Sequence, residues 1–270
     1  MRRSDGNWMN RLLLLFLVWV LQGKVLAAES SVVLRVAVAA NFAKIAEHLV
    51  ADYRKHGGVR VVFSSGSSGA LFAQIVQGAP FDVFLAADVS RPEALASRNL
   101  ILAGSRQTYA IGQLALWDTN LIDAEPASDK NLERLLVRAG RLSIANPETA
   151  PYGLAAIQSL KALGILSSIH RQLVRGNSVL QAYQYVETGN VERGLVAFHL
   201  IEDKNQSIII PQHLYAPIKQ QMVIIKSSQR KTEAKRFQAF MLSSAVQKHL
   251  QSIGFLMSEH DIEKTQSAGE

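Results

Sequence analysis

The 270-residue sequence contains no cysteine. This absence excludes disulfide bonds, thiolate metal sites and a cysteine nucleophile. It also excludes the lipid-modified cysteine by which many exported proteins are tethered to a membrane. An exported form of this chain is therefore expected to be free in the periplasm, with a fold that is stabilised by its hydrophobic core alone.

Dense clusters of positive charge are also absent. The formal net charge is +7, but the first 28 residues hold four Lys or Arg and one acidic residue, which leaves the remainder near +4. No stretch is basic enough to follow a phosphate backbone, so we expect no nucleic-acid partner.

Long hydrophobic runs are missing except near the start of the chain. Leu12 to Leu21 form an apolar run of ten residues, which follows several arginines and precedes Ala27 and Ala28. A membrane-spanning helix needs roughly 20 apolar residues. The pattern is typical of a secretory signal peptide, and we predict that residues 1–28 are removed on export.

The sequence motifs of common enzymes are absent as well. There is no GxSxG, no GK[ST] after a glycine-rich loop, and no HExxH, and the seven histidines are scattered. We therefore predict a protein that is not an enzyme and has neither a cofactor nor a cation site. One alternative from another class stays open, which is a secreted serine hydrolase that uses a serine of the loop 64–69.

What the sequence does contain is an alternation of β and α patterns. Residues 32–39 are apolar and β-branched, as in a strand that is buried on both faces, and residues 42–53 repeat apolar side chains at helical spacing. Further strands are expected over 59–63, 82–86, 108–117, 142–145, 173–175, 194–200 and 218–226, and further helices over 70–77, 131–138, 151–163, 179–186, 232–242 and 244–253. Such an alternation predicts doubly wound α/β sheets.

Two of the expected strands, 108–117 and 218–226, are unusually long. We interpret them as two crossings between domains. Domain I would then be discontinuous and comprise residues 29–108 and 219–270, whereas domain II would comprise residues 109–218.

Four turns share one design, in which a strand leads through polar or small residues into a helix start. They are Ala39–Asn41, Ser64–Gly69, Asn146–Gly153 and Asn177–Val179. Each helix start carries unpaired N–H groups and a partial positive charge, and ligands of open α/β sheets gather at the carboxyl ends of the strands. Singly, each turn is an ordinary cap or linker, but together they predict an anion site made of neutral donors.

These turns, together with the segment 78–88, give the chain a resemblance to the family of periplasmic molybdate-binding proteins over nearly its whole length after residue 28. The resemblance implies a type II periplasmic-binding-protein fold, with two doubly wound α/β domains and a ligand cleft between them. It further implies a monomer that binds molybdate or tungstate and delivers it to the inner-membrane permease of an ABC importer.

The resemblance also implies a ligand set. The anion should contact the backbone N–H and side-chain amide of Asn41, the hydroxyl and N–H of Ser68, and the backbone N–H groups of Tyr152 and Val179. Additional candidates are Ala40 and Ser67. Many family members have a serine at position 41 and a tyrosine in the region where this chain has His199, which leaves open whether that region contributes a contact.

A cavity with donors alone predicts selectivity for fully deprotonated anions of the right size. Phosphate at neutral pH carries a proton that needs an acceptor, and sulfate is smaller, so donors would be left unpaired at a cost of roughly 1–3 kcal/mol each. Sulfate, phosphate or an organic acid as the ligand, and a sensor role without a transporter, are the alternatives.

Overall fold

The computed structural model describes residues 32–121, 128–138 and 140–256. The expected signal peptide over residues 1–28 lies outside the described residues. The described residues from Val33 onward form one compact unit, which contains two five-stranded sheets. Within the described residues no single helix is long and apolar enough to cross a bilayer, although a bent pair over 151–172 passes by length and composition.

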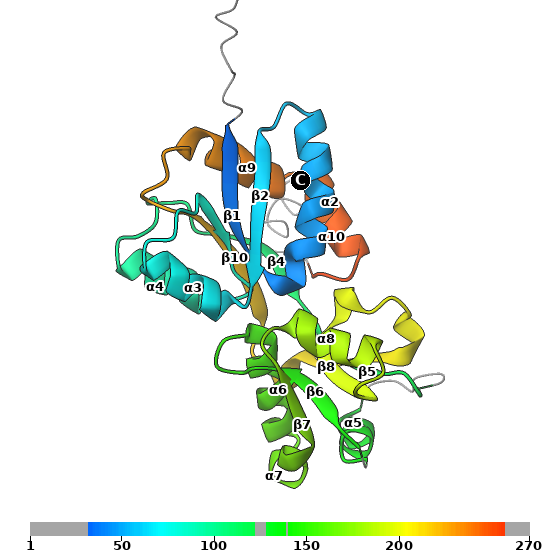
Figure 1. Ribbon diagram of the computed structural model, residues 1–270. Helices are drawn as coiled ribbons and strands as arrows, with labels where there is room; N and C mark the ends of the chain where they lie inside the picture. Colours follow the sequence, from blue (N-terminus) through cyan, green and yellow to red (C-terminus); the bar gives the residue numbers. More distant parts are fainter. Residues whose placement is uncertain (1–31, 122–127, 139, 257–270) are drawn as a thin grey trace, which may run out of the picture. The chain divides into compact units, whose positions relative to one another are not determined.

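The first sheet has the strand order β2-β1-β3-β10-β4 (Figure 1). Its strands are β1 (Val33–Ala39), β2 (Arg60–Gly66), β3 (Val83–Leu85), β4 (Gln107–Gly112) and β10 (Ile218–Ile224). Strands β1, β2 and β3 run parallel, and β10 is antiparallel to both of its neighbours. Its helices are α2 (Ala43–Lys55), α3 (Ser68–Val76), α4 (Ser90–Ser97), α9 (Lys231–Met241) and α10 (Ser244–Ser252).

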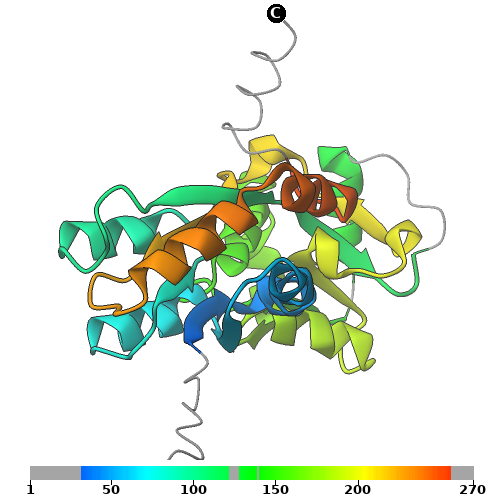
Figure 2. The same ribbon diagram turned by 90° about the horizontal axis from the view of Figure 1, so that it is seen from above.

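Strand β1 is apolar except for Arg35, because both faces of this sheet are covered. Val36 and Val38 pack into one hydrophobic cluster with side chains of α2, α9 and α10. Ala37 points to the other face and packs with side chains of α3 and α4. Figure 2 shows α2 and α10 on one side of the sheet and α3 and α4 on the other. The expected doubly wound arrangement is therefore confirmed for this sheet.

The second sheet has the strand order β7-β6-β8-β5-β9. Its strands are β5 (Leu114–Asp118), β6 (Leu142–Ala145), β7 (Leu173–Gly176), β8 (Arg193–Ala197) and β9 (Ser207–Ile209), with helices α5 (Asp129–Leu136), α6 (Pro151–Ala162), α7 (Leu166–Ile169) and α8 (Val179–Glu187). Helices α6 and α8 pack against β6 and β8 (Figure 1). The α/β fold predicted from the sequence is thus present in both sheets.

The expected long strand over 108–117 is in fact two strands. Gln113 separates β4 from β5, and the two strands belong to different sheets. Just before the break, a side chain at Gly112 would collide with the hydroxyl of Tyr152. The other expected crossing strand, β10, pairs wholly within the first sheet, so the chain returns through the segment 210–217. The domain bounds drawn from these strands stay a prediction.

Asp82 precedes β3 and connects three separate segments of the first sheet. Its buried carboxylate accepts hydrogen bonds from the backbone N–H of Arg35 at 2.8 Å and from the hydroxyl of Ser228 at 2.7 Å. Arg230 lies 3.6 Å from the same group. Asp82 therefore has a structural role, because it holds three segments of the first sheet together. Asp88 caps α4 by accepting from the N–H of Arg91 at 2.8 Å.

Substituting Asp82 with alanine is expected to lower the free energy of unfolding by about 3 kcal/mol, because it leaves buried donors without an acceptor. Urea denaturation of the two proteins measures this difference. Asp52→Ala is the matched control, since Asp52 forms an exposed pair with Lys55. An Asp82 variant as stable as the Asp52 variant would contradict the structural role.

Candidate functional site

A small cavity lies where four helix starts meet. It is lined by Ala39, Ala40, Asn41, Ser67, Ser68, Ala87, Ala150, Pro151, Tyr152, Ser178 and Val179. The six residues carried over from the resemblance, Ala40, Asn41, Ser67, Ser68, Tyr152 and Val179, are all among them. The structure thus brings the six together, and their contact with a ligand stays a prediction.

The helix starts give the cavity its electrostatic character. A 3-10 turn, η1 (Ala40–Phe42), and helices α3, α6 and α8 all begin at its wall. The first N–H groups of a helix have no partner within the helix and carry its positive dipole end. Of the residues that line the cavity, none carries a charge. An anion is therefore the ligand that this wall favours.

Two serines fix the starts of α3 and α8. The hydroxyl oxygen of Ser67 accepts from the N–H of Ala70 at 3.3 Å, and that of Ser178 accepts from the N–H of Gln181 at 3.2 Å. Asn177 does not cap α8, because Ser178 is the N-cap, and the N–H of Asn177 donates to the side-chain oxygen of Gln181. Since Ser67 caps α3, the helix begins at Ser68, two residues before the expected start.

Ser68 is buried, and its hydroxyl oxygen already accepts one hydrogen bond. Its oxygen accepts a hydrogen bond from the backbone N–H of Ala87 at 2.9 Å. A serine hydroxyl has one proton and two lone pairs, so this bond occupies an acceptor position and leaves the proton to be donated. Ser68 can therefore act as a donor toward a ligand in the cavity.

Asn41 is not a helix cap. Its side chain is buried, and Nδ2 donates to Oε1 of Gln220 at 3.0 Å. The helix that follows begins at Ala43 without a side-chain cap. Since an amide nitrogen carries two hydrogens, one N–H of Asn41 remains for a ligand.

The hydroxyl of Tyr152 lies deep beside the cavity. It accepts from Nε2 of Gln220 at 3.2 Å, and the side chain is buried. Burial raises the pKa of Tyr152 far above its ordinary value. The phenol therefore stays protonated and neutral at physiological pH, where it can act as a hydrogen-bond donor.

Gln220 is the functional residue that sequence reasoning missed. It lies on β10, is fully buried, and contacts both Asn41 and Tyr152. The signal in the sequence is a pair of glutamines in a strand whose other residues, apart from Lys219, are apolar, since a buried amide needs partners.

His199 lies behind the cavity and not in its wall. Its Nε2 is 2.9 Å from the backbone oxygen of Asn41, and its ring stacks on Phe255 at 4.3 Å. The strand expected over 194–200 ends at Ala197, so that His199 lies in a 3-10 turn. Burial lowers the pKa of His199 to about 4, against the bond to Asn41, and the charge of Lys204 lowers it further. His199 is thus a neutral support for the Asn41 turn.

The free energy of unfolding is expected to fall as the pH decreases below 6.5. Above that pH the imidazole of His199 is neutral in both states, whereas between pH 6.5 and 4 only the unfolded state takes up the proton. The loss reaches about 3 kcal/mol at pH 4. Urea denaturation at several pH values measures it.

His199→Phe should reduce this slope, while His48→Phe, at an exposed position, should not. An equal slope in both variants would exclude His199 as its origin.

Two hydrogen bonds join loops of the two sheets beside the cavity. The N–H of Gly69, at the start of α3, donates to the backbone oxygen of Thr149 at 2.9 Å. Arg91 donates to the backbone oxygen of Glu148 at 2.9 Å, while its other nitrogen pairs with Asp88 at 2.8 Å. The Glu148 side chain itself is exposed and outside the cavity wall. These two bonds hold the starts of α3 and α4 against the loop that precedes α6.

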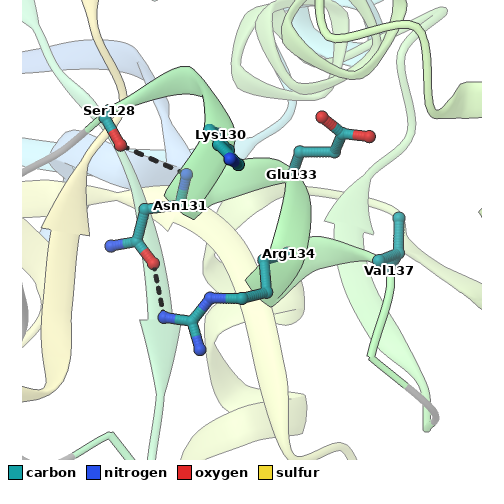
Figure 3. A pocket seen from close by; sticks show the side chains of 6 residues that line it. All are labelled: Ser128, Lys130, Asn131, Glu133, Arg134 and Val137. Carbon is teal, nitrogen blue, oxygen red and sulfur yellow. Dashed lines mark hydrogen bonds between the residues drawn. The ribbon is translucent and has the colours of Figure 1, made fainter.

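Other parts of the described structure are weaker candidates for a ligand site. A shallow hollow lies along α5, lined by Ser128, Lys130, Asn131, Glu133, Arg134 and Val137 (Figure 3). Its residues come from a single helix and the cap of that helix, and both signs of charge are present. In residues 32–121, 128–138 and 140–256, no group of three or more His, Asp or Glu side chains is placed to hold a metal ion.

Comparisons with known proteins agree with this geometry. Residues 34–256 match the family model of bacterial extracellular solute-binding proteins. The chain is 37% identical to the molybdate-binding protein of Rhodobacter capsulatus over 223 residues, which cover 82% of this chain and 86% of the relative. It is 40% identical to the molybdate-binding protein of Azotobacter vinelandii over 210 residues, which cover 75% and 81%.

Comparison with a solved structure also identifies a molybdate-binding protein as a relative. The periplasmic molybdate-binding protein of Azotobacter vinelandii superimposes with a TM-score of 0.76 at 37% identity, covering 84% of this chain and all of the solved chain.

Proposed function

Because the chain belongs to the bacterial extracellular solute-binding proteins, and among them to the family of molybdate-binding proteins, we propose that it captures molybdate or tungstate and delivers the ion to an ABC importer. The observation that carries this proposal is the cavity formed by four helix starts, whose wall is neutral and rich in donors. We propose Asn41, Ser68, Tyr152 and Val179 as the contacts of the anion, with Ala40 and Ser67 beside them.

The hydrogen-bonding capacity of the wall supports a fully deprotonated oxyanion. Ser68 has its acceptor position occupied by the N–H of Ala87, and Asn41 directs its NH2 group toward Gln220 with one hydrogen to spare. No carboxylate lines the cavity to accept the proton of a phosphate. Phosphate is therefore the weaker candidate, and sulfate is opposed by its smaller size.

A serine hydrolase is not supported by the same geometry. The cavity wall holds neither a histidine nor an acid that could activate Ser68. The one histidine behind it, His199, faces the backbone of Asn41. The family is a class of binding proteins, and we propose that this member has no enzymatic activity and needs no cofactor.

The remaining features of the proposed function concern the whole protein. Export by a cleavable signal peptide over residues 1–28, without a lipid anchor, would deliver it to the periplasm as a free monomer. We propose the domain division 29–108 with 219–270 against 109–218, and the two separate sheets support its discontinuous order, although β4 extends past residue 108 within the first sheet. Closure of these domains over the ion would desolvate it and strengthen each hydrogen bond, and it is a change that a permease can recognise.

Thermal unfolding with added oxyanions tests the proposal. A ligand at 100 times its Kd adds about 2.7 kcal/mol of stability, which raises the Tm by roughly 5 to 10 °C for a chain of this size. We expect molybdate and tungstate to give this shift. A shift with phosphate or sulfate in their place would retain the fold and contradict the ligand.

A further inference from the structure

Gln220 connects the two sides of the cavity through a single buried amide. Its Oε1 accepts from Nδ2 of Asn41 at 3.0 Å and from the hydroxyl of Tyr109 at 3.1 Å. Its Nε2 donates to the hydroxyl of Tyr152 at 3.2 Å. Asn41 follows β1 of the first sheet, whereas Tyr152 belongs to α6 beside the second.

We propose that Gln220 is a specificity-determining positioning residue, whose amide makes both Asn41 and Tyr152 face the cavity as hydrogen-bond donors. Gln220 itself does not line the cavity, so its effect passes through these two side chains. The inference rests on the proposed binding of an oxyanion and identifies what gives that site its preference for a deprotonated one.

The effect on Asn41 follows from the symmetry of an amide. An asparagine side chain can present either its oxygen or its NH2 group in the same space, and neighbouring groups decide between them. Because Gln220 places an oxygen 3.0 Å from Asn41, only the NH2 orientation forms a hydrogen bond there. The second hydrogen of that NH2 group is then free to meet an anion, whereas a reversed amide would oppose it with an oxygen.

The effect on Tyr152 follows from the single proton of a phenol. Nε2 of Gln220 occupies a lone pair of the Tyr152 oxygen, so the phenolic proton must point elsewhere. The Asn41 side chain also hydrogen-bonds with this hydroxyl, and both residues are part of the cavity wall. An oxyanion in the cavity would compete for the same proton.

Tyr109 holds Gln220 in the orientation that this requires. The Tyr109 side chain is fully buried, and its hydroxyl donates to Oε1 of Gln220 at 3.1 Å, with the backbone oxygen of Ala86 at 3.3 Å as a second acceptor. A bulge in β10 between Gln220 and Gln221 turns the two neighbouring side chains to different partners. In this orientation both polar atoms of the Gln220 amide have hydrogen-bond partners.

The test compares three variants by titration calorimetry with molybdate and with inorganic phosphate at pH 7. Gln220→Met keeps the length of the side chain and removes both of its hydrogen-bonding groups. We expect its molybdate affinity to fall about 10-fold, and the ratio of molybdate to phosphate affinity to fall with it, because Asn41 and Tyr152 are then free to offer an acceptor to a protonated oxygen. Gln220→Glu should lose about 100-fold or more, since a carboxylate accepts the hydrogen bond of the Tyr152 hydroxyl and repels the anion.

Gln221→Met is the matched control. Gln221 is the next residue on β10, and its Nε2 donates to Thr108 at 3.3 Å, away from the cavity. Tyr109→Phe provides a second approach should Gln220→Met fold poorly, because it removes the group that orients Gln220 and leaves Asn41 and Tyr152 unchanged. It should lower the molybdate to phosphate ratio in the same direction.

The outcomes separate this inference from the proposed function. If wild type and Gln221→Met both bind molybdate tightly while the folded Gln220→Met and Tyr109→Phe proteins keep the wild-type affinity and ratio, the role of Gln220 is wrong and the function stands. If wild type and Gln221→Met bind no molybdate, the proposed function itself fails. The inference is supported if the Gln220 and Tyr109 variants lose molybdate affinity and have a lower ratio of molybdate to phosphate affinity, while Gln221→Met keeps the wild-type values.

Discussion

Ser68→Ala is expected to weaken molybdate binding about 10- to 100-fold, because a hydrogen bond from a buried hydroxyl to a charged group is worth about 1.5–3 kcal/mol. Ser68 is almost fully buried at the first position of α3, and its oxygen is already an acceptor for Ala87. The donated proton is therefore the contribution that alanine removes from the ligand. Calorimetric titration of the two proteins gives the ratio of their Kd values.

Ser65→Ala is the control for this substitution. Ser65 lies three residues earlier on β2 and is exposed, so the same change of side chain should leave the affinity unchanged. Equal affinities of the Ser68 and Ser65 variants, with both folded, would remove Ser68 from the binding site.

A side chain at position 69 is expected to oppose closure of the cleft. A Cβ atom built on Gly69 would lie 3.0 Å from the Cα of Thr149 and 3.1 Å from the guanidinium of Arg91. The N–H of Gly69 bonds to the backbone oxygen of Thr149 at 2.9 Å, so the two loops approach too closely for a larger residue. Forcing a methyl group into such a contact costs roughly 1–3 kcal/mol, so Gly69→Ala should bind molybdate about 10-fold more weakly and Gly69→Val over about 100-fold more weakly.

The reason for the loss at Gly69 differs from that at Ser68. The valine side chain obstructs only the joined loops, so thermal unfolding of the ligand-free protein should be unchanged while the stabilisation by molybdate disappears. Gly66→Ala is the control, because a Cβ there would meet Leu71 at an ordinary 3.5 Å. A Gly69→Val protein that binds as tightly as Gly66→Ala would contradict the closed arrangement of these loops.

Much of the site could be predicted because its residues are local in sequence. Each helix start follows a strand directly, so the turns at Asn41, Ser68, Tyr152 and Val179 could be recognised from the pattern of apolar and small residues. The carboxyl ends of parallel strands then placed them on one edge of each sheet. The structure gathers all four around one cavity.

The parts that could not be predicted depend on contacts between distant segments. Gln220 is 179 residues from Asn41, and nothing around it in the sequence indicates that its amide meets that side chain. The contact of Gly69 with Thr149 likewise appears only after both sheets are assembled. The break at Gln113 was hidden because residues on both sides of it are suited to strands.

The position of His199 also depends on contacts between distant segments and could not be predicted from the sequence. From the sequence it could belong to the core or to the site, since it follows the buried strand β8. The structure places its ring between Phe255 and the Asn41 turn, where it supports the site without entering the cavity wall. Because its pKa is about 4, its charge is constant between pH 6 and 8. The affinity for an oxyanion should accordingly change little over that range.

The central claim is that a neutral, donor-rich cavity selects a fully deprotonated tetrahedral oxyanion by its size. Isothermal titration of the protein with molybdate, tungstate, sulfate and phosphate in parallel tests it most directly. We predict tight one-to-one binding of molybdate and tungstate, with little or no heat from sulfate and phosphate. Binding of sulfate or phosphate with equal or greater affinity, or no binding of any of the four ions, would contradict it.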